Sequence, residues 1–156
     1  MADIGPISDL KGMLAGMEPT LREGRYRFVP HGPEEDFIDL LHRTFAMVRE
    51  DEGMTLVIRA RRDDPGPIFA GITLQVHSAL EGVGLTAAIA TALATADIAC
   101  NVVAGYHHDH LFVPWDARDA AMESLKSLSA QARRWFCCSI GFVTASALLG
   151  MKMRVL

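Results

Sequence analysis

The segment LEGVGLTAAIATAL, from Leu80 to Leu93, is followed closely by DIACNVVAG, from Asp97 to Gly105. The first segment opens with a glycine-rich turn and continues as a run of alanine and other helix-forming residues. The second is apolar and rich in β-branched residues, which is typical of a buried strand. Another strand-like run, from Phe69 to His77, comes before both. These segments predict a strand, a tight turn, a helix and a second strand.

The residues that follow continue this alternation. His110 to Val113 has the composition of a further strand, and Gly105 to Asp109 is short enough to be the turn of a hairpin. Apolar residues at helical spacing then predict a helix from Asp116 to Ala132. The predicted order from residue 69 onward is therefore β-α-β-β-α.

The region before residue 61 has a similar mixture of elements. A helix is expected from Ile7 to Met17, where Ser8 or Asp9 can cap the first turn. The other elements expected there are the strands Gly24–Val29, Thr44–Val48 and Met54–Ala60 and a short helix at Phe37–Leu41. The polar segment RRDDPGP, from Arg61 to Pro67, contains two prolines and marks an internal boundary.

The glycine turn and the strand after it resemble an ACT domain, a small regulatory module that binds amino acids. The matching pattern is an acidic residue three positions before a glycine (Glu81 and Gly84), a leucine that opens a helix, and a strand of the type Ile-x-x-Asn-Val at Ile98–Val102. The chain to about residue 132 is similar to short two-part ACT proteins, whose HDH hairpin is matched by His108–Val113. The chain departs from many ACT loops at Val83, where they carry proline.

The resemblance implies an α+β protein with a ferredoxin-like βαββαβ ACT fold, dimerised side by side. We expect a degenerate ACT-like N-terminal half at residues 1–64, a clearer ACT domain at 68–132, and an apolar C-terminal extension of unknown role at 133–156. The expected function is a non-catalytic regulatory module that binds an amino acid and works as a homodimer, without a cofactor. Its ligand is expected at the interface, near the first strand–helix loop.

The chemistry of this loop fits a ligand. A helix N-terminus presents unpaired backbone N–H groups, which attract a carboxylate. Gly82 and Gly84 have no Cβ and allow close approach, while the Asn101 amide offers both a donor and an acceptor. The expected ligand-binding residues are His77, Ser78, Leu80, Glu81, Gly82, Val83, Gly84, Leu85, Asn101 and Val102.

A purely structural interpretation of the loop stays open. The glycines could serve only to turn the chain or to allow packing against another helix. Ser78 and Glu81 have the spacing of a capping box, in which Glu81 would return a hydrogen bond to the backbone and the helix would begin at Ser78.

The cluster HHDH, from His107 to His110, gives a second hypothesis. Strand alternation can place His108 and His110 on one face, and His77 could supply a third ligand to a metal such as zinc. Asp109 could then orient an imidazole or act as a base in a metal-dependent enzyme. We favour a hairpin tip without metal and expect no catalytic residues. A ligand-free interaction or dimerisation subunit is a further alternative.

Composition excludes some classes of protein. Half of the 156 residues are hydrophobic, which argues against disorder. The formal net charge of −4 and the lack of a basic stripe argue against nucleic-acid binding. The three cysteines do not have the number and spacing of a disulfide framework, and Cys100 is expected to be a packing residue in an apolar strand and not a nucleophile. The N-terminus lacks the pattern of a secretory signal. We therefore expect a cytoplasmic protein.

The C-terminal segment from Trp135 to Met151 has no charged residue. It lies near the lower limit of length for crossing a bilayer, and a membrane contact through residues 135–151 is an alternative that we do not favour. Packing against the sheet or a dimer partner is the preferred interpretation, and an atypical or disordered extension is the third. The aromatic and β-branched content would allow part of the segment to be a strand.

Overall fold

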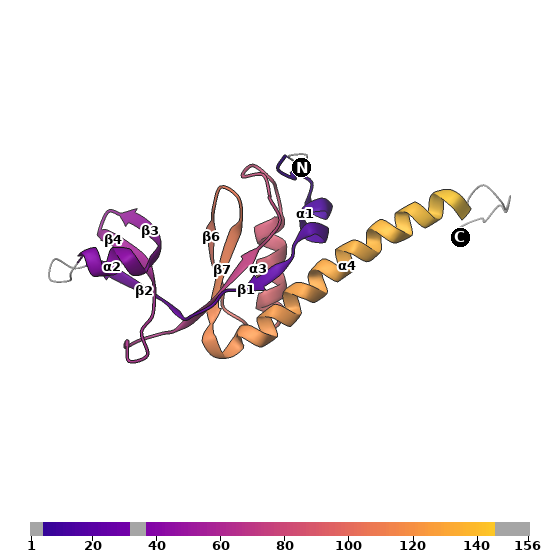
Figure 1. Ribbon diagram of the computed structural model, residues 1–156. Helices are drawn as coiled ribbons and strands as arrows, with labels where there is room; N and C mark the ends of the chain where they lie inside the picture. Colours follow the sequence, from indigo (N-terminus) through magenta and orange to yellow (C-terminus); the bar gives the residue numbers. More distant parts are fainter. Residues whose placement is uncertain (1–4, 32–36, 146–156) are drawn as a thin grey trace.

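A computed structural model gives the fold and describes residues 5–31 and 37–145 (Figure 1). The strands are β1 (Pro19–Leu21), β2 (Tyr26–His31), β3 (Thr44–Glu50), β4 (Gly53–Arg59), β5 (Phe69–Leu74), β6 (Asn101–Ala104) and β7 (Asp109–Pro114). The helices are α1 (Leu10–Gly16), α2 (Phe37–Arg43), α3 (Leu85–Thr95), the short 3-10 helix η1 (Trp115–Ala117) and α4 (Arg118–Ala145). This mixture confirms the predicted α+β class.

The strands form one antiparallel sheet in the order β3-β4-β2-β5-β7-β6, and β1 also pairs with β5. From β5 onward the order of elements is β5-α3-β6-β7-α4, which confirms the predicted β-α-β-β-α. The predicted hairpin is also confirmed, because β6 pairs with β7 and Ala104 lies opposite Asp109.

In the expected βαββαβ order a last strand would follow the second helix. Here a strand of the N-terminal half, β1, pairs with β5 in its place. The described chain continues after β7 through α4 to Ala145, and no further strand follows within it. Instead β1 pairs antiparallel with β5, with Thr20 opposite Thr73, on the edge that β7 leaves free. β2 meets the same strand at one pair, Tyr26 and Phe69. One strand therefore serves both halves of the sheet.

The two faces of β5 and β7 bury different cores because side chains alternate along a strand. One face packs under α1, α3 and α4, and its core includes Ile72 and Leu111. The other face carries aromatic rings from both halves of the chain. Among them, Tyr26 and Phe112 lie edge to face with ring centroids 5.4 Å apart. This aromatic cluster joins the N-terminal half to the C-terminal half.

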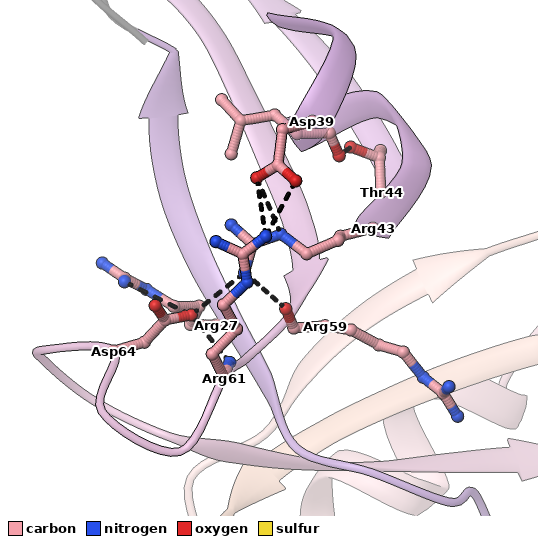
Figure 2. Close-up of polar contacts among 8 residues, drawn as sticks. Arg27, Asp39, Arg43, Thr44, Arg59, Arg61 and Asp64 are labelled. Carbon is pink, nitrogen blue, oxygen red and sulfur yellow. Dashed lines mark hydrogen bonds and ion pairs between the residues drawn. The ribbon is translucent and has the colours of Figure 1, made fainter. Parts of the chain in front are cut away.

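An ion-pair network connects α2 to the segment after β4 (Figure 2). The Arg43 guanidinium lies 3.3 Å from Asp64 and 3.6 Å from Asp39. Arg61 donates through its side chain to Asp39 at 2.8 Å and through its backbone N–H to Asp64 at 2.8 Å. That backbone hydrogen bond, with the charges of Arg43 and Arg27, lowers the pKa of Asp64. The network fixes the start of the predicted boundary segment against the N-terminal half.

The last helix is longer than predicted. The sequence pattern indicated an end at Ala132, but α4 continues to Ala145 and projects beyond α1 (Figure 1). The first glycine or proline after Arg118 is Gly141, so no helix-breaking residue stops the helix at 132. The strand alternative for Trp135 onward is wrong as far as Ala145, and residues 146–151 lie outside the described residues. Within the described chain, no helix has the length and apolar character needed to span a membrane.

Candidate functional site

The segment between β5 and α3 carries most of the predicted site residues. A short parallel bridge joins it to the N-terminus, with Ile7 opposite Ser78. The Ile7 N–H donates to the His77 carbonyl at 2.8 Å, and the Ala79 N–H donates to the Ile7 carbonyl at 2.9 Å. The next turn is closed by the Gly82 N–H, which donates to the Ala79 carbonyl. The N-terminal half thus fixes the position of this segment, which we call the site loop (residues 75–84).

The first turn of α3 begins at the end of the site loop. The predicted capping box is wrong, because the helix starts at Leu85 and its N-cap is Gly84, with φ of +100°. Ser78 lies seven residues before the first residue of the helix, and its hydroxyl donates instead to the carboxylate of Asp109 on β7. Within the described chain, no side chain caps α3, whereas Asp9 caps α1 by accepting from the Gly12 N–H at 2.7 Å. The first amides of α3 are therefore left for water or a ligand.

Asp109, the first residue of β7, faces this helix end. Its side chain is among the few buried polar ones, at 8% exposure, and its Oδ2 accepts from the Ser78 hydroxyl at 3.0 Å. Within the part of the chain that the structure describes, Ser78 is the one donor to this carboxylate, and Oδ1 has none. Asp109 lines a small cavity of about 60 Å³ together with Met13, Ser78, Ala79, Leu80, Gly82, Leu85, Thr86 and Ala104. A charged oxygen, unpaired helix amides and a hydroxyl therefore meet in one small space.

A larger cavity of about 250 Å³ shares Ser78, Ala79 and Leu80 with the first one as lining residues. Its lining comprises Pro6, His77, Ser78, Ala79, Leu80, Glu81 and Tyr106. Aromatic side chains of the β6–β7 turn stand beside it. The His107 ring lies 5.5 Å from that of His77 and 4.9 Å from that of Tyr106, measured between centroids.

The space in front of the two glycines is occupied by α1. A Cβ at Gly82 would lie 3.0 Å from the Met13 sulfur, and one at Gly84 would lie 3.1 Å from the Leu10 side chain. The two glycines therefore allow α1 to pack closely against the site loop. This is the structural alternative given for them in the sequence analysis. The ligand space lies to the side of the glycines, in the two cavities.

The structure gathers part of the predicted ligand set. His77, Ser78, Leu80 and Glu81 line the larger cavity, while Gly82 and Leu85 line the smaller one. Val83 is exposed and lines neither cavity. Asn101 and Val102 lie opposite Phe112 and Leu111, toward the end of β6 away from Ala104, and line neither cavity.

The histidines predicted as metal ligands have separate surroundings. His108 lies in the turn before β7, within 3.4 Å of the Val76 carbonyl. His110 lies in β7 with Nδ1 3.0 Å from the Thr73 hydroxyl and with its ring against Phe45. Burial and the nearby charge of Arg22 lower the pKa of His110. Among the side chains that the structure describes, no three of His, Cys, Asp or Glu are placed to hold a metal ion, so the trio of His77, His108 and His110 is not assembled.

Cys100 packs partly against the helix-side core. Burial raises the pKa of its thiol to about 11, so the thiol stays protonated at neutral pH and is a weak nucleophile. This agrees with the interpretation of Cys100 as a packing residue.

Sequence reasoning missed several residues that line the cavities, among them Met13, Tyr106 and Asp109 as a ligand contact. The alternation of β7 was the available signal for Asp109. Leu111 and Val113 are apolar residues of one face, and Asp109 shares that face two residues earlier. Met13 comes from the distant N-terminal helix, and nothing local indicated its position.

Comparisons with known proteins agree with the fold. One ACT domain family model matches residues 70–127, and a second ACT domain family model matches residues 6–64. No curated protein matches the chain.

Several solved structures are similar. A Vibrio cholerae protein of unknown function, described as a possible transport protein, is 40% identical, with 77% of this chain and 95% of that chain covered and a TM-score of 0.66. An Agrobacterium tumefaciens protein is 20% identical, with coverage of 72% and 89% and a TM-score of 0.56. Aspartokinase III of E. coli, solved with aspartate and ADP, is 10% identical, with coverage of 70% and 32% and a TM-score of 0.52. The last two likenesses concern the fold alone.

Proposed function

The chain belongs to the ACT domain family and carries two ACT domains in tandem, and from this premise we propose that it is a non-catalytic regulatory module that binds a free amino acid. The ligand occupies the two cavities beside the site loop. Two facts support this proposal. ACT domains are regulatory modules, and polar groups that can bind an amino acid line the two cavities.

The observation that carries the proposal is the position of Asp109. Its Oδ1 is free to accept from the α-ammonium of an amino acid, next to a Ser78 hydroxyl that already holds Oδ2. Leu85 and Thr86, in the first turn of α3, line the same cavity and bring uncapped backbone N–H groups for the α-carboxylate. A zwitterion is the ligand that satisfies both a buried carboxylate and a helix N-terminus at once.

Regulation requires that binding change a contact with a partner. Large apolar side chains are exposed around the site loop and the β6–β7 turn: Leu80 at 64%, Val83 at 83% and Tyr106 at 73%. We propose that a second copy of the chain covers this end in a homodimer, so that the ligand biases the dimer interface. We also keep the expectation of a cytoplasmic location, which the free thiol of Cys100 supports.

The test is calorimetric titration of the purified full-length chain with each standard amino acid, beside thermal unfolding. A ligand at 100 times its dissociation constant adds about 2.7 kcal/mol to the free energy of unfolding, which is visible as a shift in Tm. Asp109→Asn is expected to weaken binding about tenfold or more, since a charge-assisted hydrogen bond contributes roughly 1.5–3 kcal/mol.

The matched control is Asp119→Asn, because Asp119 is an exposed carboxylate on α4 that lines neither cavity. It should bind as the wild type does. Asp109→Asn keeps a side-chain oxygen that can accept from the Ser78 hydroxyl. We therefore expect this variant to fold, which circular dichroism and Tm measure. Full affinity in Asp109→Asn, or no binding by any amino acid, would contradict the proposal.

A further inference from the structure

The charges that line the two cavities are all of one sign. Asp109 contributes a carboxylate to the smaller cavity and Glu81 contributes one to the larger, and neither lining includes a lysine or an arginine among the described residues. The groove beside α4 is different, because there Asp119 and Glu123 are accompanied by Lys126 and Arg134. The formal charges on the side chains that line the two cavities are thus negative.

The amino acid's own head group uses only one of these carboxylates. Asp109 is buried beside the N-terminus of α3, where its carboxylate can accept a hydrogen bond from the α-ammonium. Glu81 lies three residues further along the site loop than Ser78, on the wall of the larger cavity, and is exposed. A side chain that extends from the head group into the larger cavity would therefore end near a second carboxylate.

The rest of the larger cavity favours a long side chain with a cationic end. Its volume of about 250 Å³ compares with about 60 Å³ for the smaller cavity, so most of the space lies here. Pro6 and Leu80 give it apolar wall for a methylene chain. Tyr106 adds an aromatic ring, whose face attracts a cation.

We infer that the ligand is an amino acid with a cationic side chain, of the lysine or arginine class, and that Glu81 determines this specificity. The inference rests on the proposed function, because it concerns the same site. A carboxylate side chain would be repelled by Glu81, and an aliphatic one would leave that charge without a partner. A cationic side chain neutralises it, while Asp109 pairs with the α-ammonium.

The test compares cationic amino acids with neutral ones of nearly the same shape. The full-length chain is titrated with arginine against citrulline, and with lysine against norleucine, at about pH 8, where imidazoles of ordinary pKa are neutral. We expect the cationic member of at least one pair to bind about fivefold more tightly, the size of one ion pair at a solvated site. Glu81→Gln should remove this preference.

Glu123→Gln on α4 is the matched control and should keep the preference. Equal binding of both members, or tighter binding of the neutral one, overturns the specificity inference, and the proposed function stands if Asp109→Asn still weakens that binding. A preference that survives in Glu81→Gln overturns the role of Glu81. Failure of every amino acid to bind overturns the proposed function itself.

Discussion

Gly82 leaves little space between the site loop and α1. A Cβ built there would meet the Ala79 carbonyl oxygen at 2.9 Å and the Met13 sulfur at 3.0 Å. Gly82→Ala should therefore lower the free energy of unfolding by about 1–3 kcal/mol, the usual cost of overpacking. Thermal or urea unfolding measures the loss. Gly5→Ala is the control, since a Cβ at Gly5 meets nothing within 4 Å, and an equal loss in both variants would contradict the steric explanation.

His110 should make stability depend on pH. Burial and the charge of Arg22, and to a smaller extent that of His108, lower its pKa from the ordinary 6.5, although Asp109 opposes them. Below pH 6.5 the unfolded chain therefore takes up a proton that the folded chain resists, so the free energy of unfolding falls until the folded pKa is reached. Above 6.5 both states are neutral, and this contribution is constant.

The measurement is urea unfolding of the wild type and of His110→Asn between about pH 7.5 and 5.0. The wild type should lose more stability over this interval than the variant. His107→Asn, at an exposed neighbouring position, is the control. A pH dependence that is the same in His110→Asn and the wild type would show that His110 is not its source.

At the scale of elements, the ion-pair network holds the segment after β4 against α2. Asp64→Ala would leave Arg43 and Arg27 without this carboxylate and the Arg61 N–H without its acceptor. We expect a loss of about 1–3 kcal/mol in unfolding free energy, measured by denaturation near neutral pH. Because the folded pKa of Asp64 is lowered, its contribution is present above 3.8 and is lost as the pH falls below that value.

The neighbouring Asp63 is the control, because its side chain is exposed. Asp63→Ala should leave stability nearly unchanged and preserve hydrogen-exchange protection of the Arg61 and Asp64 amides, which Asp64→Ala should reduce. Equal stability of Asp64→Ala and the wild type would mean that the network contributes no net stabilisation.

Elements with a clear local pattern were predictable from the sequence. The alanine-rich helix α3 and the β6–β7 hairpin follow from composition and turn length, and both were confirmed. β1 was not predicted, because a strand of three residues after Met17 has no period to detect. Only its pairing with β5, about fifty residues away in the chain, makes it a strand.

The site was only partly predictable for the same reason. His77, Ser78 and Glu81 share one loop with the glycine motif, and the structure keeps them together. Asp109 depends on the register of β7, which decides whether its carboxylate faces the helices or the other side of the sheet. Asn101 is near the site loop in the sequence but does not reach the cavity, because it lies three positions before Ala104, the residue of β6 that lines the cavity.

At the scale of the whole molecule, the halves are joined through the shared strand β5, through one aromatic cluster and through the packing of α1 in the helix-side core. β5 has β1 and β2 on one edge and β7 on the other, and Phe112 from the C-terminal half packs among Tyr26, Phe28 and Phe45 of the N-terminal half. The site loop is held by Ile7 and covered by α1 in the same way. The N-terminal half is thus part of the architecture of the proposed binding site.

Sharing of β5 also limits how this gene can be rearranged. A recombination event could carry residues 70–127, the whole of one family-model match, into another gene. Because β1 and β2 would be left behind, one edge of β5 would be unpaired in the new protein, and unpaired strand edges promote aggregation. We therefore expect the two domains to be stable only when they are kept together. Sequence boundaries of repeated domains, even when clear, need not be the boundaries at which evolution or an engineer can cut.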